Sequence, residues 1–241
     1  MSEGFDYSIV LPAYQEARNL ELLLPKIQSE MRKLGIAHEI LVVDTPAPMD
    51  DTAAVCRTLG VRYVNRLPGT VFGDAVRTGI REASGRKILF MDADGSHSPE
   101  FIPQMISRAG DCDVVIASRY ISGGATENNP LLIVMSRFLN VTYSIILGLP
   151  VRDVSNSFKI YPAQMLKSLQ LRCDNFDIIE EILFKLKRAH PQLRILEIPY
   201  TFRKRVFGKT KRNLVVFMLT YLITILRLRF SANRPPLSSK A

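Results

Sequence analysis

Two aspartates one residue apart, Asp92 and Asp94 in segment 90–97 (FMDADGSH), are the residues best placed to do chemistry. They follow an apolar run, 87–91, that is typical of a buried strand. In an open α/β sheet, ligands bind beyond the carboxyl ends of the strands. Two hard carboxylate ligands at that edge suit Mg²⁺ or Mn²⁺ bound to nucleotide phosphates. The spacing therefore predicts a metal and diphosphate site.

A plain turn is the alternative interpretation of these residues. Asp-Ala-Asp-Gly also connects strands to helices, with Asp94, Ser96 or Ser98 as the cap of a helix that begins at Pro99. The rest of the chain favours the metal site over a turn alone.

Residues 7–118 alternate apolar strands with amphipathic helices. This order predicts an α/β fold with a mainly parallel, Rossmann-like sheet and helices on both faces. No GxGxxG or GxxxxGK[ST] loop follows the first strand, which argues against a dinucleotide-binding protein and against a P-loop nucleotide-binding protein. The predicted strands are 7–11, 39–43, 62–65, 87–91 and 113–117, and the predicted helices are 17–34, 52–59, 73–83 and 99–109.

The second half of the chain, 119–212, is less regular, and we expect it to bind the acceptor. Together with the nucleotide-sugar half, 1–118, it is expected to form one catalytic domain. Its predicted elements are an apolar helix at 131–149, a strand at 157–161 and an amphipathic helix at 177–189.

The uncharged run 214–226 lies between basic residues and is shorter than the roughly twenty residues that span a bilayer. We expect an amphipathic helix over 213–230 that lies at a membrane interface, and a flexible tail over 231–241. A helix that packs in the core or against another subunit, in a homo-oligomer, is an alternative of equal weight.

The net charge of +9 predicts an anionic partner. No nucleic-acid-binding motif is recognised, and the basic cluster lies beside the apolar run, which favours a membrane surface carrying a phosphorylated substrate. No secretory signal is recognised either, so we expect a cytoplasmic protein peripheral to the membrane. The basic cluster consists of Arg203, Lys204, Arg205, Lys209, Lys211 and Arg212.

The chain has three cysteines, Cys56, Cys112 and Cys173. They lack CxxC spacing, so we expect them to be reduced.

A set of motifs, in a fixed order along the chain, resembles family 2 glycosyltransferases, and most closely the dolichol-phosphate and polyprenyl-phosphate mannose synthases. The resemblance implies a GT-A fold that binds a nucleotide sugar and a divalent cation, Mg²⁺ or Mn²⁺. The motifs are LPAYQE (11–16), VVD (42–44), NRLPG (65–69), DAD (92–94) followed by His97 and Pro99, SRY (118–120), 153–161, and RVFGKTK (205–211).

The resemblance also implies roles for individual donor-side residues. Asp92 and Asp94 match the metal and diphosphate site, with Asp94 as the direct ligand. The base and ribose are expected to lie among Pro12, Tyr14, Glu16 and Asp44. The alternative is that Pro12 and Tyr14 only end a strand while Glu16 begins a helix, where an acid is favourable.

Bond breaking at the anomeric carbon leaves negative charge on a nucleoside diphosphate, which a cation and basic side chains stabilise. Arg205 and Lys211 match the basic diphosphate clamp of the family. The clamp would close as a loop with Gly208 as its hinge. An exposed basic face near a membrane is the alternative.

The acceptor region departs from the family. The related synthases carry a basic pair before a serine that helps to bind the lipid phosphate, whereas residues 131–135 of this chain are apolar. Ser136 and Arg137 remain, together with Arg119. Either these residues suffice for a lipid phosphate, or the acceptor is not a phosphate.

A hydroxyl acceptor needs a general base, whereas a phosphate acceptor is already anionic. The available acids of the acceptor half are Asp153, Glu180 and Glu181. Glu180 is also expected to bind the acceptor, and Glu181 could instead pair with Lys185 at i,i+4 spacing. Asp153 matches an acidic position that faces the donor sugar in the family, and it is the best candidate for a base or sugar-binding acid.

Residues 44–52 form a turn that is one residue longer than is usual in the family, so the nucleobase stays open between guanine and uracil. We expect an inverting, metal-dependent transfer of a hexose, by default mannose from GDP-mannose, to a polyprenyl or dolichyl phosphate. The alternatives are a UDP-sugar with a hydroxyl acceptor and, less favoured, an inactive homologue that organises a membrane glycosylation complex.

Overall fold

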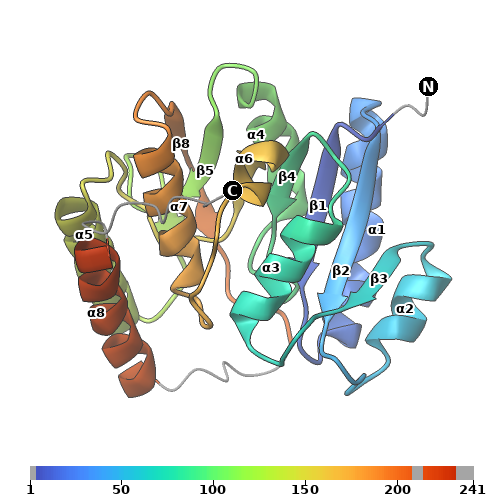
Figure 1. The fold of residues 1–241 in the computed structure, drawn as a ribbon. Helices are drawn as coiled ribbons and strands as arrows, with labels where there is room; N and C mark the ends of the chain where they lie inside the picture. Colours follow the sequence, from blue (N-terminus) through green and yellow to red (C-terminus); the bar gives the residue numbers. More distant parts are fainter. Residues whose placement is uncertain (1–3, 208–213, 232–241) are drawn as a thin grey trace, which may run out of the picture.

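The computed structural model of the chain describes residues 4–207 and 214–231. Within them, a seven-stranded sheet with the order β3-β2-β1-β4-β7-β5-β8 forms the centre of the molecule (Figure 1). Its strands are β1 (Tyr7–Pro12), β2 (His38–Asp44), β3 (Arg62–Asn65), β4 (Lys87–Phe90), β5 (Val114–Ser118), β7 (Lys159–Pro162) and β8 (Ile195–Pro199).

Strand direction decides which residues meet at the sheet edge. β1 pairs in parallel with β2 and β4, and β5 pairs in parallel with β8. β7 lies between β4 and β5 and is antiparallel to both. β7 therefore starts at the edge of the sheet where β4 and β5 end, and the segment that precedes β7 lies at that edge. The expected mainly parallel sheet is confirmed, with β7 as the exception.

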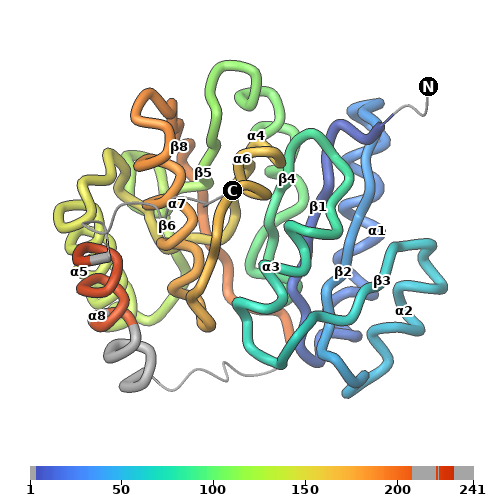
Figure 2. The backbone as a smooth tube through the Cα atoms, viewed as in Figure 1, coloured from blue at the N-terminus to red at the C-terminus, as the bar shows by residue number. Residues whose placement is uncertain are grey.

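Helices cover both faces of the sheet (Figure 2). Alternate residues of β1 serve the two cores: Ile9 and Leu11 pack with α1, while Val10 packs with α3. One face carries α1 (Ala17–Leu34), α2 (Thr52–Thr58), a 3₁₀ turn at Pro99–Phe101 and α4 (Ile102–Arg108); the other carries α3 (Phe72–Glu82), α6 (Ala163–Lys167) and α7 (Ile178–Ala189).

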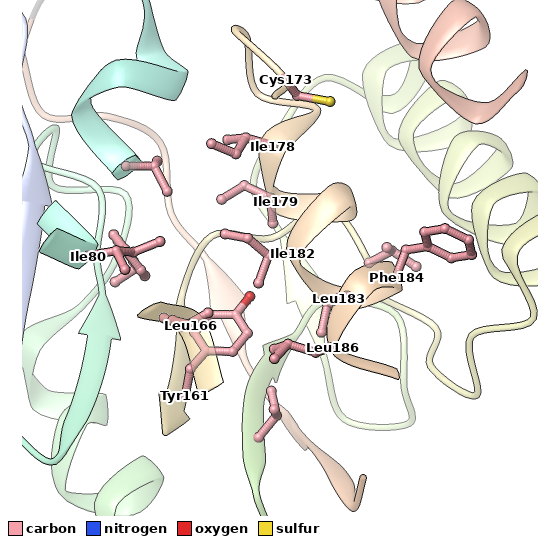
Figure 3. Packing of buried hydrophobic residues seen from close by; sticks show 14 of the residues in the cluster. Ile80, Tyr161, Leu166, Cys173, Ile178, Ile179, Ile182, Leu183, Phe184 and Leu186 are labelled. Carbon is pink, nitrogen blue, oxygen red and sulfur yellow. The ribbon is translucent and has the colours of Figure 1, made fainter. Parts of the chain in front are cut away.

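The core under α7 is apolar and closely packed. Figure 3 shows Ile182 and Leu186 of α7 next to Tyr161 of β7 and Leu166 of α6. Residues 178–184 of α7 and Leu186 are all buried, so the first two turns of the helix are enclosed on every side. This packing holds β7, and with it the segment that precedes β7, in place.

Two further helices, α5 (Pro130–Leu147) and α8 (Leu214–Ser231), lie side by side at one end of the sheet (Figures 1 and 2). The Tyr143 hydroxyl of α5 donates to the Tyr221 carbonyl of α8 at 3.0 Å, and the Thr224 hydroxyl donates to Asp177. Ile225 and Leu228 are buried in the same core. One face of α8 thus packs into the domain, while Ile223, Leu226 and Phe230 are exposed.

The predicted elements of the first half agree with the structure to within a few residues. The sequence analysis did not identify α6, β8, or the two-stranded sheet of β6 (Ala125–Thr126) and β9 (Thr201–Phe202). Lys211, Gly208 and residues 232–241 of the predicted tail lie outside the described residues.

Candidate active site

The Asp92–Ser96 turn follows β4 at the edge where the parallel strands end. Gly95 has φ +80°, and a Cβ there would stand 2.7 Å from a Val206 methyl group, so both the backbone and the space favour glycine. Asp94 Oδ1 accepts hydrogen bonds from the Ser96 amide at 3.0 Å and the Ser96 hydroxyl at 2.6 Å. The turn therefore fixes the direction of the Asp94 carboxylate.

The capping alternative from the sequence is not what the structure shows. Ser98 occupies the N-cap position before Pro99, but its side chain forms no capping hydrogen bond. Its hydroxyl contacts Glu100, and Asp94 binds Ser96 within the turn. Both aspartates keep their carboxylates at the sheet edge, where about a fifth to a quarter of each side chain is exposed.

The two carboxylates fit a divalent cation. Ser157 donates to Asp92 Oδ1 at 2.7 Å, while Asp92 Oδ2 lies 3.9 Å from His97 Nε2 and Asp94 Oδ2 lies 3.9 Å from Arg205 Nη2. One oxygen of each acid is thus beyond hydrogen-bonding distance of these neighbours. No group of three or more acidic, histidine or cysteine side chains that could hold a metal occurs within the described residues. Such a pair suits an ion that takes its remaining ligands from substrate phosphates and water.

Residues 203–207 pass directly over this turn. The Arg203 amide donates to the Ser96 carbonyl at 3.2 Å, and the Val206 amide donates to the Asp94 carbonyl at 3.0 Å. Arg205 Nη2 donates to Glu16 Oε1 at 2.9 Å. The structure therefore brings together Asp94 and Arg205, both expected at the donor diphosphate, and adds Glu16, which was expected beside the base and ribose.

Glu16 is held between two partners. Burial raises the pKa of its carboxyl group, against the opposing hydrogen bond from Asn19 and the charge of Arg205. Asn19 also accepts a hydrogen bond from the Phe207 amide at 3.1 Å. Asn19, which the motifs did not indicate, thus connects α1 to the segment that carries Arg205.

The predicted base and ribose residues line the ends of β1 and β2. Tyr14 is exposed, whereas Asp44 is almost fully buried and accepts a hydrogen bond from the Tyr63 hydroxyl at 3.1 Å. Burial raises the pKa of Asp44. Pro12 ends β1, where the Ala13 carbonyl accepts from the buried guanidinium of Arg66.

Arg66 also donates to the backbone carbonyls of Asp44, Thr70 and Val71. One side chain therefore connects three loops at this end of the sheet.

Asp153 is not exposed to a substrate, which corrects its expected position facing the donor sugar. The residue is fully buried, and its Oδ2 accepts from the Arg119 amide and Nε, both at 2.8 Å. Its Oδ1 accepts from Arg119 Nη2 at 2.7 Å. Burial raises the pKa of Asp153, but the charge and hydrogen bonds of Arg119 outweigh it and leave the pKa lowered. The same contacts occupy Arg119, which was expected to bind the acceptor.

Glu180 and Glu181 are also buried, in α7. Burial raises the pKa of Glu180 to about 8, so the expected acceptor-binding role does not match its position inside the core. Glu181 accepts from the backbone amides of Arg172 and Cys173 and pairs with Lys185 at 2.6 Å. The i,i+4 pair that the sequence offered as the alternative for Glu181 is present.

Arg137, by contrast, is exposed to solvent. It lines an open pocket of about 260 Å³ together with Arg152, and both side chains are exposed. Ser136 contacts buried Asn140 instead, whose Nδ2 donates to the Ser136 carbonyl at 2.8 Å and to its hydroxyl at 3.5 Å. Besides the two arginines, the pocket is lined by mainly apolar side chains. They are Tyr120, Val141, Ser144, Ile145 and Val151.

The sequence analysis missed four residues that the structure places at these sites: Ser157, His97, Asn156 and Arg152. Ser157 and His97 contact Asp92, Asn156 contacts His97, and Arg152 lines the open pocket. His97 and the 153–161 segment were quoted as motifs without a role. Ser157 and Asn156 contact residues that lie 65 and 59 positions away in the chain, so spacing alone did not reveal them.

Comparison with known proteins gives a consistent result. Residues 8–170 match the model of "Glycosyl transferase family 2". The chain is 33% identical over 216 residues to the dolichol-phosphate mannosyltransferase of Pyrococcus furiosus, which covers 85% of this chain and 58% of that protein. It is 30% identical over 219 residues to the undecaprenyl-phosphate mannosyltransferase of Micrococcus luteus, covering 85% of this chain and 86% of that protein.

Solved structures agree in fold. The glucosyl-3-phosphoglycerate synthase of Mycobacterium tuberculosis, in complex with Mn²⁺, UDP and phosphoglyceric acid, superposes with a TM-score of 0.72 over 97% of this chain and 80% of that one. The sequence identity is 19%, so this similarity concerns the fold. The expected GT-A fold is confirmed.

Proposed function

This chain belongs to glycosyl transferase family 2, and we propose that it transfers a hexose, by default mannose from GDP-mannose, to a polyprenyl phosphate with inversion at the anomeric carbon. The proposal follows the named activities of its relatives in Pyrococcus and Micrococcus. The chain spans 58% of the length of the Pyrococcus protein and 86% of the length of the Micrococcus protein.

The donor diphosphate is proposed to lie between the Asp92–Ser96 turn and Arg205. A Mg²⁺ or Mn²⁺ ion held by Asp94, with Asp92 beside it, would neutralise charge on the departing diphosphate. Arg205 lies 3.9 Å from Asp94 and can donate to the same phosphates. The neighbouring Glu16 orients the guanidinium through its hydrogen bond at 2.9 Å.

One observation favours a phosphate acceptor over a hydroxyl acceptor. Asp153 and Glu180, the expected general bases, are both fully buried, whereas the open pocket presents two arginines. A phosphate monoester is already anionic near neutral pH and needs charge partners more than a base. Arg137 and Arg152 thus supply the positive charge that residues 131–135 lack.

The proposed function is tested by pairing GDP-mannose, UDP-glucose and UDP-GlcNAc with a short polyprenyl phosphate in the presence of Mn²⁺ or Mg²⁺. We expect lipid-dependent release of one nucleoside diphosphate and formation of a lipid-linked sugar. Donor binding without any response to the lipid phosphate would favour a hydroxyl acceptor. Absence of metal-dependent nucleotide binding in a thermal shift assay would favour an inactive homologue.

Replacing both Arg137 and Arg152 by alanine is expected to raise KM for the polyprenyl phosphate about 10- to 100-fold. A hydrogen bond to a charged group contributes about 1.5–3 kcal/mol, and each 1.4 kcal/mol is tenfold. Because both arginines are exposed to solvent, we count the pair as one such bond. The KM for the nucleotide sugar should change little. The matched control is Arg108→Ala, an exposed arginine on α4 that pairs only weakly with Asp111. An unchanged lipid KM in the double variant would remove this pocket from the acceptor site.

The exposed side of α5 supports binding to a membrane, where a polyprenyl phosphate resides. α5 is long and apolar enough to cross a bilayer by length and composition. Its exposed apolar side chains recur with helical spacing and continue onto α8, beside the exposed Arg227 and Arg229. They are Leu131, Val134, Phe138, Val141 and Ile145 on α5, with Ile223, Leu226 and Phe230 on α8.

Replacing Phe138 and Ile145 by aspartate is expected to lower binding to phosphatidylglycerol vesicles by at least about tenfold, since each loses about 1.5–3 kcal/mol of apolar burial. Co-sedimentation with vesicles measures this. Leu22→Asp, at an exposed leucine of α1, is the matched control. Unchanged vesicle binding together with a shift from dimer to monomer would instead identify the face as a contact between subunits.

A further inference from the structure

A continuous set of hydrogen bonds joins the donor side of the site to the acceptor side through residues 153–157, termed the bridge segment. The segment leads into β7, which is antiparallel and lies between β4 and β5. It therefore stands between the turn that follows β4 and Arg119, which follows β5. Its two ends contact the two sides of the site.

The donor end of the bridge segment holds Asp92 at two points. The Ser157 hydroxyl donates to Asp92 Oδ1 at 2.7 Å. His97 Nδ1 accepts from the Asp92 amide at 2.9 Å, and His97 Nε2 lies 3.0 Å from Asn156 Oδ1. The side chain and the backbone of Asp92 are thus both bound to the segment, the second through His97.

The partners of His97 determine its tautomer. Because Nδ1 accepts a hydrogen bond from a backbone amide, the ring proton resides on Nε2 and is donated to Asn156. The ring is fully buried and stacks on Phe158 with 4.7 Å between ring centroids.

The acceptor end of the bridge segment holds Arg119. Asp153 forms the buried ion pair, and the Ser155 hydroxyl accepts from Arg119 Nη2 at 2.9 Å. Ser155 also exchanges two hydrogen bonds with Asn140 of α5, each at 2.9 Å. Asn156 closes the connection, since its backbone amide donates to Asp153 Oδ1 at 3.2 Å.

Asn156 is therefore bonded to both sides. Its Oδ1 faces His97, its backbone amide binds Asp153, and its Nδ2 donates to the Ala117 carbonyl of β5 at 2.5 Å. The residue is buried. All three of these polar groups are used, so the side chain has one orientation that satisfies both neighbours.

We infer that Asn156 and His97 are positioning residues that set the place of the donor-side carboxylate Asp92 relative to the acceptor side of the pocket. The inference rests on the proposed transfer to a polyprenyl phosphate. A transfer between two bound substrates depends on their relative placement, and a displacement of about 1 Å can cost about 10²-fold in rate. Hydrolysis of the donor by water depends on the donor side alone.

The test compares transfer with hydrolysis in Asn156→Ala. We expect kcat for transfer to the polyprenyl phosphate to fall about 10- to 100-fold. Lipid-independent hydrolysis of the nucleotide sugar, and metal-dependent binding of the nucleoside diphosphate, should each fall by a clearly smaller factor than transfer does. The control is Asn175→Ala, at an exposed asparagine before α7, for which neither rate should change.

Two His97 variants separate the contact of Nδ1 with the Asp92 amide from the contact of Nε2 with Asn156. They remain informative if Asn156→Ala fails to fold. His97→Asn can keep an acceptor for the Asp92 amide, and His97→Gln can keep a donor toward Asn156. We expect both to lose transfer more than hydrolysis. In a His97→Asn background the contact to Asn156 is already lost, so adding Asn156→Ala should cost less than it does alone.

Failure of the inference and failure of the proposed function are distinguishable. Suppose that the wild-type protein transfers sugar, and that these variants either lower transfer and hydrolysis by the same factor or change neither rate. The residues then do not position Asp92 relative to the acceptor side of the site. If the wild-type protein uses no polyprenyl phosphate, the proposed function itself is wrong.

Discussion

Asp94→Asn is expected to lower the rate of sugar transfer by about 10³-fold while the chain stays folded. The substitution keeps the shape of the side chain and an oxygen for the hydrogen bonds from Ser96, but it removes the negative charge. That charge lies at the open edge of the sheet, 3.9 Å from Arg205, where cation and diphosphate are proposed to bind. The rate is measured as nucleoside diphosphate released in the presence of the lipid acceptor.

Metal-dependent nucleotide binding gives a second measurement for the same variant. The thermal stabilisation that Mn²⁺ and a nucleoside diphosphate give to the wild type should be lost in Asp94→Asn. Asp111→Asn, at an exposed carboxylate after α4, is the matched control and should behave as the wild type. Asp94→Asn with more than a tenth of the wild-type rate would contradict the assignment of Asp94 to the reaction.

The order of strands and helices in the first half could be predicted because each element has its own periodicity. α1 buries Leu20, Leu23, Leu24 and Ile27, a spacing that one helical face produces. Pattern does not give strand direction, however. The strand expected at 157–161 was found as β7, but its antiparallel direction follows from the connections before and after it.

Short elements were missed for a related reason. α6 has five residues, too few for a helical period to repeat, and β8 pairs only with β5 at the end of the sheet. Three of the five residues of β8 are only partly buried, so its apolar pattern is weak. Periodicity becomes informative only when an element presents a consistent buried face over more than one repeat.

The candidate site divides in the same way. Asp92 and Asp94 could be predicted because both follow one strand, and their position depends on local sequence. Ser157 lies 65 residues from Asp92, and its role depends on the pairing of β4 with β7. A motif can place such residues in one region, but the contact itself is a property of the fold.

Asp153 shows the limit of motif comparison most clearly. Its position in the 153–161 motif predicted an acid that faces the donor sugar, but the direction of the carboxylate is determined by Arg119, 34 residues away. Two opposite charges buried this deeply pair with each other rather than with a substrate, because burying either charge alone would be costly. The expected base is thus a partner of Arg119 in the bridge between the two halves of the site.

Asp153→Ala is therefore expected to lower the free energy of unfolding by about 3–5 kcal/mol, since it leaves the Arg119 guanidinium buried without its carboxylate. Chemical denaturation near neutral pH measures this loss. Because the pKa of Asp153 is lowered in the folded chain, the wild-type pair contributes its stability above the usual carboxyl pKa and loses it as the pH falls below that range. Asp111→Ala, which removes an exposed carboxylate, is the control and should cost little.

Removing both charges distinguishes a structural pair from substrate-binding groups. The double variant Arg119→Met, Asp153→Leu leaves no unpaired charge and should recover most of the stability lost in Asp153→Ala. If this variant is stable and still transfers sugar, Arg119 and Asp153 act by holding the bridge segment. A stable variant that binds the nucleotide sugar but shows a raised KM for the polyprenyl phosphate would assign Arg119 to the acceptor. An Asp153→Ala protein as stable as Asp111→Ala would contradict the buried pair itself.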